Sequence, residues 1–214
     1  MDLIKKLPRL FYVNLLWLLC CVPVITAGAS TCAAFAVTLR LADDDEEVSS
    51  IRGITGRFFK AFKQDLLQGF LILIFTLVSF GLGGLFVYLA WDSGFNLIKI
   101  AAIAGYFLVV LVINFYSYPL IARYSNSFVN TLRNSIAVFL QYANASVKTL
   151  AIVLVCLAAI YFTSYIYYVG VIILPAVIFY LISLTAKDIF VKLENPAPVE
   201  ESEEEVEEGS EEEV

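Results

Sequence analysis

The stretch CVPVITAGAS, residues 21–30, interrupts the first long apolar run of the chain, residues 11–39. A helix of about 20 apolar residues crosses the hydrocarbon core of a bilayer, so the run itself is long enough to span. However, Pro23 lacks a backbone donor and Gly28 weakens a helix interior. The stretch therefore predicts that the first membrane element of this chain is broken near its middle.

Two arrangements of this element fit the sequence. In one, residues 21–30 form the tip of a re-entrant hairpin whose halves, residues 13–21 and 30–39, are each about ten residues long and reach about 15 Å. Pro23 then ends the first half, and Ser30 caps the free amides that begin the second. In the other, the whole run is one long tilted span with a kink. Because such a break is tolerated where neighbouring helices satisfy its backbone, we expect it to be buried against other spans.

The remaining sequence predicts a multi-pass membrane protein. Of the 214 residues, 60% are hydrophobic, whereas soluble domains are about 45–50% apolar. Pro119 predicts a helix end and Pro175 a kink. We predict an all-α, polytopic transmembrane helical bundle of about five membrane segments, the first one broken or re-entrant, within residues 1–194. The later segments are residues 66–91, 100–118, 149–165 and 169–186, the last two forming a tight hairpin.

Basic residues are distributed unevenly over the connections between these segments. Residues 40–65, residues 119–148 and the C-terminal end, which would share one side of a membrane, carry ten Lys and Arg, while the other connections carry only Lys99. Because cytoplasmic loops are enriched in Lys and Arg, this distribution predicts a cytoplasmic C-terminus. The three basic residues near the N-terminus satisfy the same rule only in the hairpin arrangement.

Residues 195–214 differ from the rest of the chain. They contain ten glutamates and no Lys or Arg, so the body is mildly basic although the whole chain has a net charge of −6. A segment of such low hydrophobicity and high charge cannot form a packed core. We expect a disordered acidic tail that is dispensable for folding and membrane insertion.

Two connecting segments, residues 56–70 and 127–143, are amphipathic at helical spacing. Such helices either lie in the headgroup region or prolong the spans; alternatively, one face docks a cytoplasmic partner. In the second segment, the apolar stripe comprises Phe128, Val129, Leu132, Ile136, Phe139, Leu140 and Ala143, and Thr131 faces away from it. In the first, the candidate partner or interface residues are Phe58, Phe59, Lys60, Phe62 and Lys63.

The sequence carries few groups that perform chemistry. It has no histidine, which removes Ser-His-Asp and Cys-His catalysis and the HExxH zinc motif. Its four cysteines lie in apolar segments, where cysteine commonly behaves as a small buried hydrophobe. We expect no enzyme activity, no cofactor, no metal and no nucleic-acid partner.

Neutral polar residues at membrane depth occur in four of the predicted elements, and the broken one contains Asn14, Thr26 and Ser30. Their usual role is hydrogen bonding between helices. The functional alternative is a polar pocket between Asn14, the break and Asn114, because transporters often place substrate groups at broken helices. The candidate functional helix break consists of Asn14, Trp17, Pro23, Thr26, Gly28 and Ser30.

The same residues carry a family resemblance. The pattern Asn14-x-x-Trp17, then Pro23-x-x-Thr26-x-Gly28-Ala29-Ser30, followed by FFKAFK at residues 58–63, resembles the YesL family of bacterial membrane proteins. The resemblance covers roughly residues 5–190 and departs at Asp65, where the family commonly has an amide. It implies several membrane spans in a bacterial cytoplasmic membrane. The family has no established activity, and its frequent association with carbohydrate uptake implies a transport-accessory role.

We therefore expect an integral protein of the lipid bilayer that acts as an accessory or regulatory partner of a (carbohydrate) transporter, in contact with its permease or ATPase subunits. The alternative is a stand-alone permease or channel for a small solute. Ion coupling through a buried carboxylate is not expected, because the four later spans have no ionisable residue well inside them.

Overall fold

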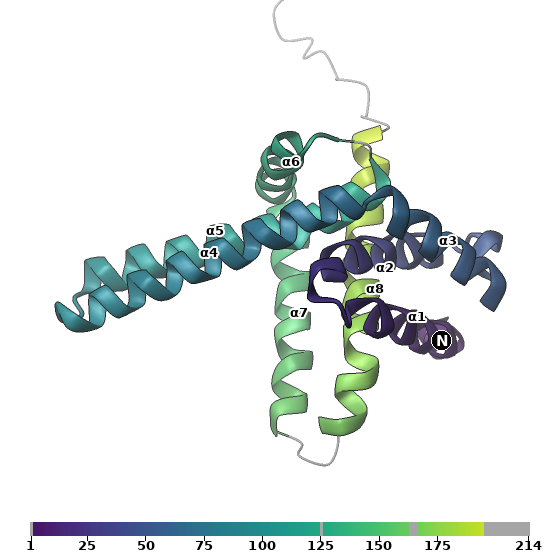
Figure 1. Cartoon of the computed structure of the whole chain (residues 1–214), viewed down its shortest axis with the longest axis horizontal. Coiled ribbons are helices and arrows are strands. Elements are labelled where there is room, and N and C mark those ends of the chain that lie inside the picture. The colour runs from purple at the N-terminus through teal and green to yellow at the C-terminus, as the bar shows by residue number, and fades with distance from the viewer. Residues whose placement is uncertain (1, 125, 163–166, 195–214) are drawn as a thin grey trace, which may run out of the picture.

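The computed structural model describes residues 2–124, 126–162 and 167–194 (Figure 1), and the predicted acidic tail lies outside them. The described residues form helices and no strand, which confirms the all-α helical bundle. The helices are α1 (Asp2–Cys21), α2 (Ala27–Ala42), α3 (Ile51–Gln64), α4 (Leu66–Asp92), α5 (Leu97–Arg123), α6 (Phe128–Gln141), α7 (Ala143–Phe162) and α8 (Tyr167–Glu194). Two short 3-10 helices, η1 (Val24–Thr26) and η2 (Glu46–Val48), flank α2.

The central helix of the fold is α2. It contacts α1, α3, α4, α5 and α8, and 13 of its 16 residues are buried. Its sequence AGASTCAAFAVTLRLA is rich in alanine and other small residues, which let neighbouring helices approach closely. Side-chain size thus places α2 in the middle, although α4 and α5 are more apolar.

Two helical hairpins leave this centre in different directions (Figure 1). The α4–α5 hairpin extends to one side, across the direction of the α7–α8 hairpin, while α1, α2 and α3 lie on the other side. In an apolar 18-residue stretch of α4, and in one of α5, only 17% of the residues are buried, compared with 67% in the stretch that contains α2. The distal part of the α4–α5 hairpin is therefore largely free, whereas its base packs against α2 and α6.

Among the residues that the structure describes, four helical segments are long and apolar enough to cross a membrane: Val24–Ala42, Leu66–Asp92, Leu97–Arg123 and Leu174–Glu194. A fifth candidate is the pair Phe128–Gln141 and Ala143–Val155, which is bent by 96° between its two helices. These four or five candidate spans agree with a multi-pass membrane protein of about five segments.

The predicted helix end at Pro119 is wrong, because α5 continues through this residue to Arg123. Proline removes one helical hydrogen bond. However, Tyr116 and Leu120 on either side of it are buried in one apolar cluster. Packing on both sides of the proline holds the helix together despite the lost hydrogen bond. Pro175 likewise lies inside a helix, α8.

The apolar stripe of α6 is only partly its buried face. Thr131 and Ser135 are completely buried, and Ser135 Oγ lies 3.0 Å from Ser117 Oγ of α5. Phe128 and Phe139 of the stripe pack against buried clusters, whereas its Val129 and Leu140 are 68% and 70% exposed. Short polar side chains let α6 lie close to α5, and the exposed part of the stripe is left to contact lipid or another protein.

Candidate functional site

The helix break reverses the direction of the chain. α1 ends at Cys21, η1 follows, and α2 begins at Ala27. At the opposite ends of these two helices, Lys6 Nζ donates to the Leu41 carbonyl oxygen over 2.7 Å. The two helices are therefore an antiparallel hairpin, and residues 11–39 are not one long tilted span.

Both arms of this hairpin are longer than the predicted half-helices. α1 has 20 residues and α2 has 16, which corresponds to lengths of about 30 Å and 24 Å. The prediction of two ten-residue halves was wrong because it counted only apolar residues. The first arm begins in the polar segment at Asp2, and the second continues to Ala42.

Hydrogen bonds hold the two arms together next to the turn. Ser30 Oγ donates to the Trp17 carbonyl oxygen over 3.0 Å, and Trp17 Nε1 donates to Thr31 Oγ1 over 3.1 Å. Thr26 Oγ1 donates to the Cys20 carbonyl oxygen over 2.7 Å. The predicted capping role of Ser30 was wrong, since η1 leads directly into α2 and Ser30 lies inside that helix. Its hydroxyl bridges the arms instead.

The break is buried on one side only. Asn14 and Ser30 are completely buried, and Trp17 and Thr26 are half-buried. Pro23 and its apolar neighbours on both sides are exposed. The expected burial of the whole break was therefore wrong for its tip, where apolar side chains project outward.

Gly28 allows a close crossing between the hairpin and α4. A Cβ at Gly28 would overlap the carbonyl oxygen of Gly69, and a Cβ at Gly69 would lie 2.6 Å from the Ala29 nitrogen. No side chain fits such spaces, so both positions require glycine for the backbones to approach this closely. The glycine of the break thus marks a helix crossing, which the sequence pattern alone did not indicate.

Asn114 belongs to a different contact. Its Oδ1 accepts from Thr76 Oγ1 of α4 over 2.6 Å, and its Nδ2 donates to the Val110 carbonyl oxygen over 2.8 Å. The amide is used inside the α4–α5 hairpin, which does not favour a polar pocket shared with Asn14.

The five candidate partner residues of α3 divide between two faces. Phe58 is completely buried and packs into the core shared with α1 and α2, and Phe62 packs against the same core. Phe59 is 38% exposed, and Lys60 and Lys63 are exposed as well. A partner would therefore reach only Phe59, Lys60 and Lys63, which we call the outer face of α3.

The acidic loop after α2 joins the ends of several helices. Lys6 Nζ of α1 lies 2.6 Å from Asp44 Oδ1. Asp43 Oδ1 lies 3.4 Å from Lys187 Nζ of α8, and Asp43 Oδ2 lies 3.8 Å from Arg123 Nη1 of α5. We call this cluster the ionic pole. Sequence reasoning missed it, although the positive-inside count had grouped these same segments on one side of a membrane.

A cavity of about 300 Å³ lies beside the ionic pole. Its guanidinium groups come from three different helices, α2, α3 and α5, and they meet two carboxylates in one small space. We call it the arginine cavity. It is lined by Ala36, Leu39, Arg40, Asp43, Asp45, Arg57, Ala122 and Arg123.

Two of the three arginines have close carboxylate partners. Arg40 Nη1 lies 2.6 Å from Asp45 Oδ2 and 2.6 Å from Glu47 Oε2. Arg123 Nε and Nη2 donate to the two carboxylate oxygens of Glu194 over 2.9 Å each. Such a two-pronged pair matches the planar fork of the guanidinium group, so these two side chains are held in place by the protein itself.

Arg57 and Asp65 are less well compensated. Within the described part of the chain, Arg57 forms no ion pair, and its Nε is buried without a hydrogen-bond acceptor. Burial, followed by the charge of Arg40, lowers the pKa of Arg57. Asp65 is buried at the α3–α4 junction, where its side chain does not cap α4. Burial raises the pKa of Asp65 to about 6, against the opposing effect of Arg57.

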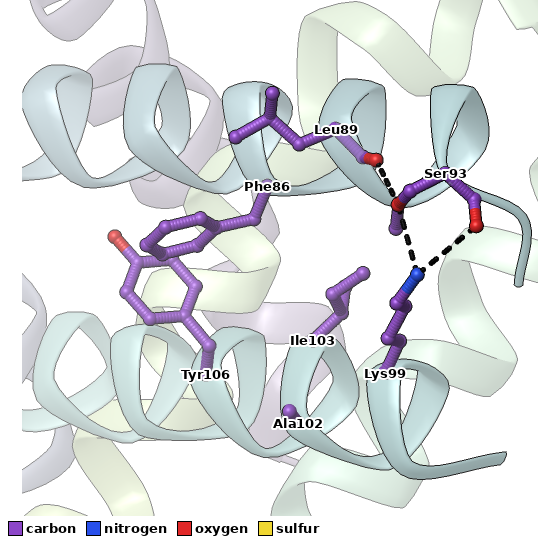
Figure 2. Close-up of a pocket in the computed structure, with 8 residues that line it drawn as sticks. Phe86, Leu89, Ser93, Lys99, Ala102, Ile103 and Tyr106 are labelled. Carbon is purple, nitrogen blue, oxygen red and sulfur yellow. Dashed lines mark hydrogen bonds between the residues drawn. The ribbon is translucent and has the colours of Figure 1, made fainter. Parts of the chain in front are cut away.

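A larger cavity, of about 440 Å³, lies between α4 and α5 near their connecting turn (Figure 2). Its walls are mostly apolar, and the rings of Phe86 and Tyr106 meet edge to face at 5.5 Å. Lys99 Nζ donates to Ser93 Oγ over 2.8 Å and to the Ser93 carbonyl oxygen over 3.3 Å (Figure 2). It also donates to the Gly94 carbonyl oxygen over 2.9 Å. A cation at the last carbonyls of a helix stabilises its end, so Lys99 closes the turn and leaves the cavity apolar.

The fold and its candidate spans correspond to a multi-pass helical membrane protein with an N-terminal helical hairpin. Residues 10–88 match the family model described as "Protein of unknown function, DUF624". The match covers α2, α3 and most of α1 and α4, and so includes both sets of candidate residues. It is narrower than residues 5–190, the range of the YesL resemblance. No curated protein and no solved structure matches the chain.

Proposed function

We propose that this chain is an integral protein of a bacterial cytoplasmic membrane, with a cytoplasmic C-terminus, that acts as an accessory or regulatory partner of a solute transporter. The observation that carries the proposal is the α4–α5 hairpin, which extends away from the body and is largely unburied (Figure 1). A helical hairpin of this kind has most of its surface free for lipid and for the spans of a second protein.

The side of α4 that faces away from α5 has the residues for such a contact. Gly81 and Gly84 lie on it, and a Cβ at either position would meet no atom of the described chain within 4 Å. Small residues at such positions let a second membrane helix approach closely. We call this surface the outer face of α4; it comprises Ile74, Leu77, Gly81, Gly84, Leu85 and Tyr88, all exposed.

The accessory role is favoured over a stand-alone permease or channel. A permease places its substrate path between its own spans, whereas α4 and α5, the two longest candidate spans, are each 17% buried over their apolar windows. The α4–α5 cavity is apolar and offers no unpaired polar group to a hydrophilic solute.

The class of transporter is part of the proposal. The resemblance to the YesL family supports a carbohydrate transporter, and the match to a family of unknown function is compatible with it. We assign the outer face of α4 to the permease. The outer face of α3, with Phe59, Lys60 and Lys63, is exposed and carries two cations, and it suits contact with an ATPase subunit or a cytoplasmic loop.

Affinity purification from the native membrane in mild detergent tests the proposal. The wild-type chain is expected to bring a permease or its ATPase with it. The double substitution Gly81→Leu with Gly84→Leu fills the outer face of α4 and should reduce the recovered permease about tenfold or more, since each close contact is lost. Leu82→Phe enlarges an exposed side chain on the flank of the same helix and should not reduce it.

Two results would contradict the proposal. One is recovery of the chain alone, with both variants behaving like the wild type. The other is uptake of a solute into liposomes that contain this chain as the sole protein, which would establish the permease alternative.

A further inference from the structure

The arginine cavity gathers positive charge from distant parts of the chain. Arg40, Arg57 and Arg123 come from α2, α3 and α5, and the lining also holds Asp43 and Asp45. Glu47 and Glu194, which lie outside this lining, pair with Arg40 and Arg123. A cavity of about 300 Å³ is large enough for a small polyatomic anion, since one water molecule occupies about 30 Å³.

Among the described residues, Arg57 is the lining arginine without an ion pair. Arg40 is saturated by Asp45 and Glu47, and Arg123 is held by Glu194. Arg57 is half-buried, and its buried Nε has no acceptor within the described chain. A buried guanidinium nitrogen without an acceptor is costly, and the group best suited to remove that cost is an oxyanion that accepts from its planar fork.

We propose that the arginine cavity is a binding site for an oxyanion, a phosphate or a carboxylate, which is held by Arg57 with Arg40 and Arg123 beside it. This inference does not depend on the proposed transport role. The site favours an anion over a cation because its unused polar group, the Arg57 Nε–H, is a cationic donor. It favours an anion over an apolar ligand because five of its eight residues are charged.

Two sources of this chemistry are available to the protein. One is a free phosphate or phosphate ester. The other is the chain itself, because residues 195–214 carry ten glutamates and begin directly after Glu194, whose carboxylate already contacts Arg123 at the cavity. A carboxylate tethered this close has an effective concentration in the millimolar range, so the tail would compete with a free anion.

Phosphate titration of the purified, full-length protein in detergent tests the site. Bound phosphate is measured by equilibrium dialysis with radiolabelled phosphate, and the thermal unfolding midpoint is measured in parallel, with chloride at matched ionic strength as the reference. To remove competition, the ten tail glutamates are replaced with glutamines in a full-length variant. Saturable, phosphate-specific binding to this variant, with a rise in the unfolding midpoint, is expected.

Substitutions in α3 assign the binding to Arg57. In the glutamine-tail variant, Arg57→Gln should weaken phosphate binding about tenfold or more, because a charge-assisted hydrogen bond to a buried group is lost. Arg57→Lys keeps the charge without the planar fork and should weaken it by a smaller factor. Arg52→Gln removes an exposed arginine of the same helix that does not line the cavity, and it should bind phosphate like its parent.

Comparison of the two tails distinguishes the sources. If the wild-type tail binds phosphate more weakly than the glutamine tail, the glutamates occupy the cavity in the resting protein; if both bind equally, the ligand is a free anion. Both results support the site. The inference is overturned if the glutamine-tail variant shows no phosphate-specific binding, or if Arg57→Gln and Arg52→Gln bind phosphate equally well.

Discussion

Lys6 and Asp44 form an ion pair in which Lys6 Nζ lies 2.6 Å from Asp44 Oδ1. Lys6 also donates to the Leu41 carbonyl oxygen over 2.7 Å and to the Tyr180 hydroxyl over 3.1 Å. Although burial alone would lower the pKa of Lys6, its hydrogen bonds to Asp44 and Tyr180 raise it. The lysine therefore stays charged, and it ties the start of α1 to the end of α2 and to α8.

This contact predicts the sidedness of the N-terminus. Because Lys6 and Asp44 are in contact, we expect the N-terminus and the loop after α2 to lie on one side of the membrane, which the charge count predicts to be the cytoplasm. Single-cysteine variants at Asp2, Ser49 and Ser202, in a background without the four native cysteines, should all resist an impermeant thiol reagent in intact cells. All three should react in inverted vesicles.

Different labelling patterns would exclude different parts of this topology. If Asp2→Cys reacts from outside while Ser49→Cys does not, α1 and α2 are not a hairpin in the membrane. Reaction of Ser49→Cys or Ser202→Cys in intact cells would reverse the assigned orientation. An added cysteine in the α4–α5 turn, at Ser93, should react from outside and provides the positive control.

A second prediction concerns the stability of the ionic pole. Lys6→Ala removes a buried cation with three partners, and it should lower the free energy of unfolding by about 2 kcal/mol. Lys63→Ala removes an exposed lysine of α3 and should change it by less than about 0.5 kcal/mol. Thermal unfolding of both variants in the same detergent measures the difference. Equal effects would mean that the Lys6 contacts do not stabilise the hairpin.

Asp65 gives a prediction about pH. Its folded-state pKa of about 6 lies above the ordinary value of 3.8, so the folded state binds this proton more tightly than the unfolded state. The contribution of Asp65 to the free energy of unfolding is therefore greatest below about pH 4 and is lost as the pH rises from about 4 to 6. Asp65→Asn should remove this dependence and stabilise the protein by about 1–2 kcal/mol at pH 8.

The measurement is the unfolding midpoint between pH 4 and pH 8 for the wild type and Asp65→Asn. Asp92→Asn, at an exposed position near the end of α4, is the matched control and should leave the pH profile unchanged. The assignment would be contradicted if the unfolding midpoint of the wild type rose from pH 4 to pH 6 and that of Asp65→Asn rose equally. Asp65→Asn introduces an amide, which is the residue type that the YesL family, which the sequence resembles, commonly carries at this position.

The spans were predictable from sequence because a helix that crosses lipid must be long and apolar. Residues 66–91 were predicted as a span and α4 covers Leu66–Asp92. The end of α5 was not predictable, because packing around Pro119 and the contact of Arg123 with Glu194 depend on segments distant in sequence. The local sequence indicates that proline removes a helical hydrogen bond. It does not indicate the packing with distant segments that compensates for this loss.

The candidate site was predictable only in part, for the same reason. The break was predictable from Pro23, whereas the basic N-terminus only favoured a chain reversal over a single tilted span. The arginine cavity combines side chains from three helices at no fixed spacing, so no local pattern marks it. The buried Thr131 face of α6 was missed because short hydroxyl side chains pack well between helices, although they look polar in sequence.

The last prediction separates the two halves of the break. Gly28 is in backbone contact with Gly69, whereas Pro23 is exposed at the tip. Gly28→Ala should therefore force α2 and α4 apart and lower the free energy of unfolding by about 2–3 kcal/mol. Pro23→Ala should change it by less than about 0.5 kcal/mol. Gly56→Ala is the matched control for Gly28, because a Cβ there meets nothing within 4 Å, and it should stabilise α3 by about 0.5–1 kcal/mol. If Gly28→Ala unfolds like the wild type while Pro23→Ala is severely destabilised, the break acts through its turn geometry and not through the crossing of α2 with α4.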